Sequence, residues 1–136
     1  MLPDPCRTTI TRPCSGTGND AEGIMIKLVY CFRKRPDMSS AAFWDYWHNT
    51  HTELGIAMPG VRRLVQSRTV RNPSDPTKPD FDGMAELWFD DWDALARASA
   101  SPEWAASTAD EANFIESGSQ VYFVTEEHTV QDYVVR

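Results

Sequence analysis

The order of strand-like and helix-like segments limits this chain to few folds. Four apolar, β-branched and aromatic runs have strand length, at residues 24–34, 61–70, 84–89 and 119–128. Apolar side chains at helical spacing predict an amphipathic helix between the first two runs, ending near Leu54, and a second helical region between the last two. Suitable N-cap residues precede these segments: Ser39 or Ser40, Asp90 or Asp91, and Ser101 before Pro102. The predicted order is therefore β-α-β-β-α-β.

This order is typical of an α+β domain with the ferredoxin-like arrangement, in which four antiparallel strands form one sheet and both helices cover one face. The opposite face would carry apolar residues such as Val29, Val65, Met84 and Trp88. Because an uncovered apolar face must be buried by something else, we expect a homodimer that packs sheet to sheet, as a dimeric α/β barrel.

The length of 136 residues is that of one domain, expected at residues 24–128. Residues 1–23 are rich in Pro, Thr, Gly and Asp without a periodic apolar pattern, and we expect an irregular N-terminal tail there. Residues 129–136 are expected to form a short C-terminal extension. The Pro-rich segment after the second strand-like run cannot pair as a strand and predicts a loop.

Composition argues against several classes of partner. With 20 acidic and 13 basic residues the formal charge is −7, and no Lys/Arg run follows a phosphate backbone, so neither nucleic acid nor an anionic membrane is expected. No apolar run approaches the roughly 20 residues of a spanning helix, and the first residues do not resemble a signal peptide. We therefore expect a cytoplasmic protein with a small apolar or aromatic ligand.

The three cysteines, Cys6, Cys14 and Cys31, form no Cys-x-x-Cys motif and lie far from any histidine. Neither a disulfide framework nor a zinc site is therefore expected.

The motif F-x-x-Y-W-x-x-x-H resembles the signature of EthD-domain proteins, a group within the dimeric α/β-barrel superfamily. It is formed here by Phe43, Tyr46, Trp47 and His51. The resemblance covers roughly residues 25–128 and includes Pro59-Gly60, Asp82-Gly83-x-Ala85-Glu86-x-Trp88-Phe89, Ser101-Pro102-Glu103-Trp104, and Asp110-Glu111 before Phe114. Thr52-Glu53 follows the histidine, where many relatives have Gly-Pro.

The resemblance implies a ferredoxin-like subunit, a homodimeric barrel, and a ligand cavity in each subunit between sheet and helices. It also implies chemistry without metal, haem or flavin, because relatives include lactone isomerases and the dehydratases or decarboxylases of aromatic polyketide routes. A shared fold implies architecture more firmly than it implies a reaction.

His51 is the residue best suited to chemistry. At about 100° per residue it lies on the shoulder of the apolar helix face, whereas His48 points mostly to water. An imidazole with an ordinary pKa of about 6.5 can move a proton beside a carbonyl near neutral pH. The alternative is a core histidine that donates one hydrogen bond to a loop carbonyl.

Glu86 is the predicted catalytic partner of His51. It lies in an otherwise apolar strand, where an unpaired carboxylate on an interior face would be costly. Beside His51 it would complete an acid/base pair. The alternative is an ion pair across the sheet with Arg63, Arg68 or Lys27.

Aromatic residues are the predicted substrate contacts. Tyr46 could donate its phenol to a substrate carbonyl, although an α-helix places it on the other flank from His51. The walls of a pocket could be formed by Trp47, Trp88, Trp104 and Phe114, each of which core packing also explains. For Asp110-Glu111 we expect a solvated helix face or a bridge to an arginine, rather than metal binding.

The leading hypothesis is a cofactor-independent lyase or isomerase that acts on a hydrophobic cyclic or aromatic carbonyl compound by dehydration, decarboxylation or isomerisation. His51 would be its general acid/base and Glu86 its partner or polar anchor. A second hypothesis is a non-catalytic dimer that binds a small apolar metabolite or assists a degradation or polyketide pathway. A third is a cofactor-free oxygenase of the same superfamily.

Overall fold

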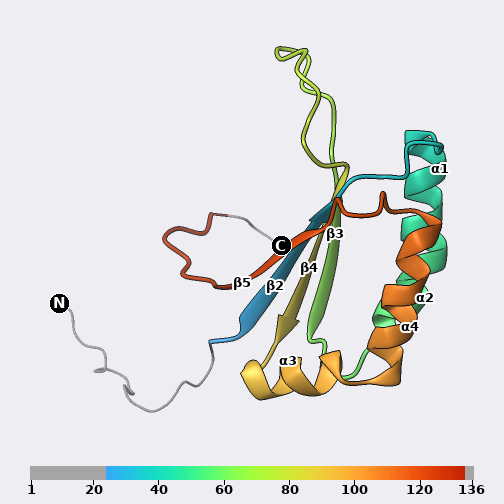
Figure 1. The fold of residues 1–136 in the computed structure, drawn as a ribbon. Helices are drawn as coiled ribbons and strands as arrows, with labels where there is room; N and C mark the ends of the chain where they lie inside the picture. Colours follow the sequence, from blue (N-terminus) through green and yellow to red (C-terminus); the bar gives the residue numbers. More distant parts are fainter. Residues whose placement is uncertain (1–23, 134–136) are drawn as a thin grey trace.

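The strand-like runs form one antiparallel sheet in the order β3-β4-β2-β5, with helices on one side of it (Figure 1). The structure, a computed structural model, describes residues 24–133. The strands are β2 (Ile26–Phe32), β3 (Arg63–Arg68), β4 (Gly83–Phe89) and β5 (Val121–Glu126). The predicted α+β, ferredoxin-like arrangement is confirmed, and three of the four strands are shorter than predicted.

The first helical region is continuous but changes its winding in the middle. It consists of α1 (Ser40–Asp45), the π-helical segment η2 (Tyr46–His51) and α2 (Thr52–Ile56). Ser39 caps it, because the Ser39 side chain accepts a hydrogen bond of 3.0 Å from the Ala42 amide. The sequence predicted one regular α-helix here, so the π-helical turn is a feature that apolar spacing did not reveal.

The second helical region is divided at its predicted restart. Helix α3 (Trp92–Ser99) is capped by Asp91, and helix α4 (Pro102–Asp110) is capped by Ser101 with a proline in its first turn. A short 3₁₀ turn, η3 (Glu111–Asn113), follows α4 directly. These caps agree with the predicted ones.

Aromatic rings fill the layer between the sheet and the helices. Phe32, Phe43, Trp47 and Phe114 are each at most 2% exposed. The Phe32 ring centroid lies 5.0 Å from that of Trp47 and 6.0 Å from that of Phe114, both in edge-on contact. A Cβ atom at Gly83 would lie 2.8 Å from Trp47 Cζ3, so the absence of a side chain in β4 lets Trp47 reach the sheet.

The opposite face of the sheet carries the residues that the alternation predicted. The strand register aligns Val29 of β2 with Val65 of β3 through Glu86 of β4. Phe123, aligned with Val29 on the other side, is 51% exposed. No helix within residues 24–133 covers this face (Figure 1).

The chain ends bear on the predicted domain limits. Residues 127–133, after β5, contain no helix or strand. The tail predicted at residues 1–23 lies outside the described residues, as do residues 134–136, so the division into tail, domain and extension stays a prediction. Among the described residues, no helix is long and apolar enough to cross a bilayer.

Candidate functional site

His51 lies at the end of η2, enclosed between this segment and α4. Its Nδ1 is 2.8 Å from Asp110 Oδ2, and its Nε2 is 3.3 Å from Ser107 Oγ. The side chain is 12% exposed, and its ring packs on Phe114 with centroids 4.7 Å apart. Asp110 and Ser107 lie one turn apart on α4. The carboxylate and the hydroxyl of this one helix therefore contact the two nitrogens of the imidazole.

Three donors converge on the Asp110 carboxylate. Tyr46 Oη donates to Oδ1 at 2.7 Å, Asn113 Nδ2 donates to the same oxygen at 2.8 Å, and His51 occupies Oδ2. Burial by itself would raise the pKa of Asp110, but these hydrogen bonds outweigh it and lower the pKa below its ordinary value. Because an ionised carboxylate only accepts, His51 Nδ1 carries the hydrogen. In the neutral imidazole, Nε2 then has the lone pair that can accept from Ser107.

Tyr46 lies on the same side of the helical region as His51, contrary to the sequence-based expectation. In an α-helix, residues five apart point about 140° away from each other. A π-helical turn closes over five residues, so Tyr46 and His51 face the same way and both reach Asp110. Such single turns are frequent at functional sites.

Glu86 is not brought to His51. Alternation along β4 turns it to the sheet face opposite the helices, where Lys27 Nζ binds its Oε2 at 2.8 Å. The Lys27 alternative therefore applies rather than the predicted acid/base pair. The same Lys27 ammonium also contacts Glu127 at 3.1 Å.

Trp88 likewise lies on the face away from His51. The Arg63 guanidinium is 4.5 Å from its ring centroid and the Lys27 ammonium 5.1 Å, while Trp88 Nε1 donates to Glu127 at 3.1 Å. It is thus no wall of a cavity that contains His51. Its position follows from the same strand alternation as that of Glu86.

The remaining predicted pocket walls belong to the layer around His51. Trp47 and Phe114 are core residues, and Trp104 packs partly buried against that core. Only Phe114 among them contacts the imidazole through its ring. His48 is exposed, as expected, and stacks on Trp44 while its Nδ1 lies 2.9 Å from Gln66 Oε1.

Sequence reasoning missed the role of Asp110-Glu111. Neither side chain forms a hydrogen bond with an arginine of the described residues 24–133. Asp110 binds His51, and Glu111 Oε1 accepts a hydrogen bond of 2.7 Å from Tyr30 Oη of β2. Burial raises the pKa of Glu111, only partly offset by its hydrogen bonds. The available signal was two adjacent carboxylates just before the buried Phe114, but which elements they face depends on the tertiary structure.

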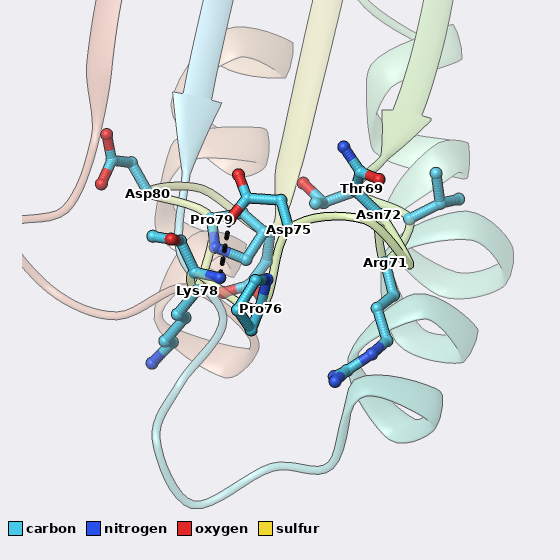
Figure 2. Close-up of a pocket in the computed structure, with 11 residues that line it drawn as sticks. Thr69, Arg71, Asn72, Asp75, Pro76, Lys78, Pro79 and Asp80 are labelled. Carbon is cyan, nitrogen blue, oxygen red and sulfur yellow. Dashed lines mark hydrogen bonds between the residues drawn. The ribbon is translucent and has the colours of Figure 1, made fainter.

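Two other features bear on possible ligands. No three His, Cys, Asp or Glu side chains within residues 24–133 are arranged to hold a metal ion. A pocket of about 560 Å³ lies in the Pro-rich loop between β3 and β4 (Figure 2). Its lining is mixed, with prolines beside polar side chains such as Thr69, Arg71, Asp75 and Lys78. It is formed by the loop itself, away from His51.

Comparison with known proteins relates this chain to one family. The family model described as the EthD domain matches residues 35–118. An uncharacterized 11.0 kDa protein from the thcB-thcC intergenic region of Rhodococcus erythropolis is 31% identical over 87 residues, which are 64% of this chain and 82% of the relative.

Solved structures share the fold, and two of them serve as examples. The crystal structure of an ethyl tert-butyl ether d (EthD) family protein from Bacillus halodurans is 30% identical, with a TM-score of 0.64 over 76% of this chain and 99% of the other. A dimeric ferredoxin-like protein of unknown function from Thermobifida fusca has a TM-score of 0.61 at 13% identity, over 83% of this chain and 100% of the other.

Proposed function

The chain belongs to the EthD-domain family, and we propose that it is a cofactor-independent lyase or isomerase that moves a proton on a hydrophobic, cyclic or aromatic carbonyl compound. His51 is the general acid/base. The observation that carries this proposal is the contact of 2.8 Å between His51 Nδ1 and Asp110 Oδ2. That contact fixes the tautomer whose Nε2 can accept a proton.

The Asp110 carboxylate contributes in two ways. It orients the imidazole, and its negative charge stabilises the imidazolium that forms when Nε2 takes a proton. A substrate would replace the Ser107 hydroxyl at Nε2, where the contact of 3.3 Å is long and easily exchanged. Positioned acid/base catalysis of this kind contributes about 10² to 10⁴ in rate.

The surroundings of His51 favour an apolar substrate. The imidazole packs on the Phe114 ring, and the centroid of the Tyr46 ring lies 5.6 Å from the centroid of the same Phe114 ring. Such rings bind aromatic surface and keep water from the reacting atoms. Isomerisation would return the proton to another carbon of the substrate, whereas dehydration would deliver it to a departing hydroxide.

A second candidate function is a non-catalytic dimer that binds a small apolar molecule or assists a pathway. It is favoured because four core rings pack directly on one another, so core packing accounts for them without a catalytic pocket. These rings are Phe32, Phe43, Trp47 and Phe114. In that case the hydrogen bonds around Asp110 serve to tie η2 to α4. The two candidates differ in whether His51 is needed for turnover.

Anthrone is a suitable probe, because it is a cyclic aromatic ketone with a weakly acidic carbon. We would follow hydrogen-deuterium exchange at that carbon in D₂O under argon, with wild type, His51→Gln and, as a matched control, His48→Gln. Acid/base catalysis predicts exchange above the buffer rate that falls about 10²-fold or more in His51→Gln and persists in His48→Gln.

Other outcomes separate the alternatives. Catalysed exchange that is unchanged in His51→Gln would refute the role of His51 as the base. Binding of anthrone without any catalysed exchange would refute the proposed reaction and support the binding dimer. Catalysed conversion to anthraquinone under air, with no catalysed exchange under argon, would instead indicate the oxygenase.

A further inference from the structure

Resting on the proposed function, we propose that Glu111 is a second catalytic residue of this site. It would be a neutral carboxylic acid that gives its proton to the carbonyl oxygen of an enolisable ketone while His51 takes a proton from carbon. Glu111 thereby takes the place that sequence reasoning gave to Glu86, which lies on the other face of the sheet.

The hydrogen bonds of Glu111 are unequally divided between its two oxygens. Oε1 accepts from Tyr30 Oη at 2.7 Å and from Gln120 Nε2 at 3.5 Å, whereas no side chain within residues 24–133 donates to Oε2. In a neutral carboxyl group the carbonyl oxygen can accept two hydrogen bonds and the hydroxyl oxygen can donate one. In the neutral form of Glu111 this arrangement places the carbonyl at Oε1 and the proton that can be donated at Oε2.

The two adjacent carboxyl groups have opposite electrostatic surroundings. Burial raises the pKa of Glu111, and the hydrogen bonds from Tyr30 and Gln120 and a charge on His51 offset this only partly. Asp110 has its pKa lowered, since its three hydrogen bonds outweigh burial. Pairs of titratable groups whose pKa values are pushed apart are the usual sign of separate acid and base roles.

The backbone connects Glu111 to the phenylalanine that packs on His51. The Glu111 carbonyl accepts hydrogen bonds from the amides of Phe114 at 3.1 Å and Ile115 at 2.8 Å, which closes the turn after α4. The same turn sets the Phe114 ring against His51. Glu111 and the Phe114 ring that packs on His51 thus belong to one short turn. Glu111 contacts the sheet through Tyr30, and Asp110 contacts the first helical region through His51.

The proposed step is balanced in protons and electrons. His51 Nε2 takes the proton from carbon, the C–H electron pair forms the new carbon-carbon double bond, and the carbonyl π pair moves to oxygen. Oε2 of Glu111 gives its proton to that oxygen. The products are an enol, an imidazolium and a carboxylate, and the reverse transfer at another position completes an isomerisation.

A titration tests the protonation of Glu111 without any substrate. The full chain carrying ¹³C-labelled glutamate would be followed by NMR against pH, with the Glu111 carboxyl signal assigned by its loss in Glu111→Gln. We expect this carboxyl to ionise above the ordinary glutamate value of 4.5, because burial raises its pKa. Ionisation at or below that value would overturn the proposal.

A binding comparison tests the donor role independently of turnover. The probes are 2-naphthol and 2-methylnaphthalene, which have the same shape but differ in an oxygen. We expect wild type and His51→Gln to prefer 2-naphthol by at least about tenfold, and Glu111→Ala to lose that preference while the control Glu103→Ala keeps it. A preference that survives in folded Glu111→Ala, or its absence in wild type, would overturn the inference.

The two proposals can fail separately. Suppose that no anthrone exchange is catalysed, but that Glu111 ionises at raised pH and the preference for 2-naphthol depends on it. The role of Glu111 as a hydrogen-bond donor is then supported, and the proposed reaction is refuted. If His51→Gln abolishes exchange while Glu111→Ala leaves both exchange and naphthol preference intact, the reaction stands and the role of Glu111 fails.

Discussion

Asp110 Oδ2 lies 2.8 Å from His51 Nδ1, although the two residues are 59 positions apart in the sequence. The contact joins the π-helical turn of the first helical region to the last turn of α4. Because Tyr46 and Asn113 share the same carboxylate, Asp110 is the centre of the polar cluster beside the aromatic core. Stability and function should therefore both depend on this one acid.

Replacing Asp110 by alanine should destabilise the fold. The change leaves the Tyr46 hydroxyl and His51 Nδ1 without their acceptor in a partly buried site, which costs about 1–3 kcal/mol. The free energy of unfolding would be measured by urea denaturation near neutral pH, with the exposed loop residue Asp80 replaced by alanine as control. Equal stability of both variants would argue against the cluster.

The loss in Asp110→Ala should also depend on pH. The pKa of Asp110 is lowered on folding, so its contribution is present above the ordinary value of 3.8 and is lost as pH falls through the folded pKa. The difference in the free energy of unfolding between wild type and Asp110→Ala should therefore become smaller as the pH is lowered. A gap that stays constant down to about pH 2 would contradict an ionised Asp110.

Glu111→Gln should have the opposite pH dependence. A raised pKa means that the folded state binds the proton more tightly, so stability is greatest below the ordinary value of 4.5 and falls as pH rises through the folded pKa. Glutamine keeps an oxygen for Tyr30 but cannot ionise. It should therefore raise the free energy of unfolding at neutral pH, by no more than about 1 kcal/mol because solvent screens part of the charge.

The same urea experiment at pH 3.5 and pH 7 checks this expectation. The two proteins should have similar stability at the lower pH and differ at the higher one. A variant less stable than wild type at neutral pH would show that Glu111 is held as a favourable carboxylate.

Gly83→Ala should disturb the core beneath the site. The added Cβ would meet Trp47 Cζ3 at 2.8 Å and Phe32 Cε1 at 3.0 Å, and overpacking of this kind costs about 1–3 kcal/mol. Gly118→Ala is the matched control, since its φ of +84° makes alanine strained but no atom lies within 4 Å. Both should lose stability, but only Gly83→Ala should change the near-ultraviolet circular dichroism of the tryptophans.

Phe123→Asp should weaken the proposed homodimer. Phe123 is 51% exposed on the sheet face that no helix of the described chain covers, and a charge there would have to be desolvated on packing sheet to sheet. Ile56→Asp changes an aliphatic residue that is 66% exposed on the helix side. Sedimentation velocity should show dissociation at low micromolar concentration for Phe123→Asp alone, and identical behaviour of both variants would place the interface elsewhere.

Local patterns were sufficient for most of the fold. Strand-length apolar runs and the caps Ser39, Asp91 and Ser101 predicted the elements, because each depends on residues close in sequence. The same patterns indicated His51 but paired it with Glu86. That pairing conflicted with the alternation along the strand, which places Glu86 on the face of Trp88, the face predicted to be uncovered by helices and found so in the structure.

The sequence by itself determined the order of elements, the amphipathic faces and the motif that contains His51. Tertiary structure decided the partners of His51, because a π-helical turn rotates Tyr46 to its side and because α4 carries Ser107 and Asp110 to its two nitrogens. Hydrophobic periodicity reports which face is buried, but it carries no information on which distant polar groups meet there. Those meetings depend on packing between elements far apart in the chain.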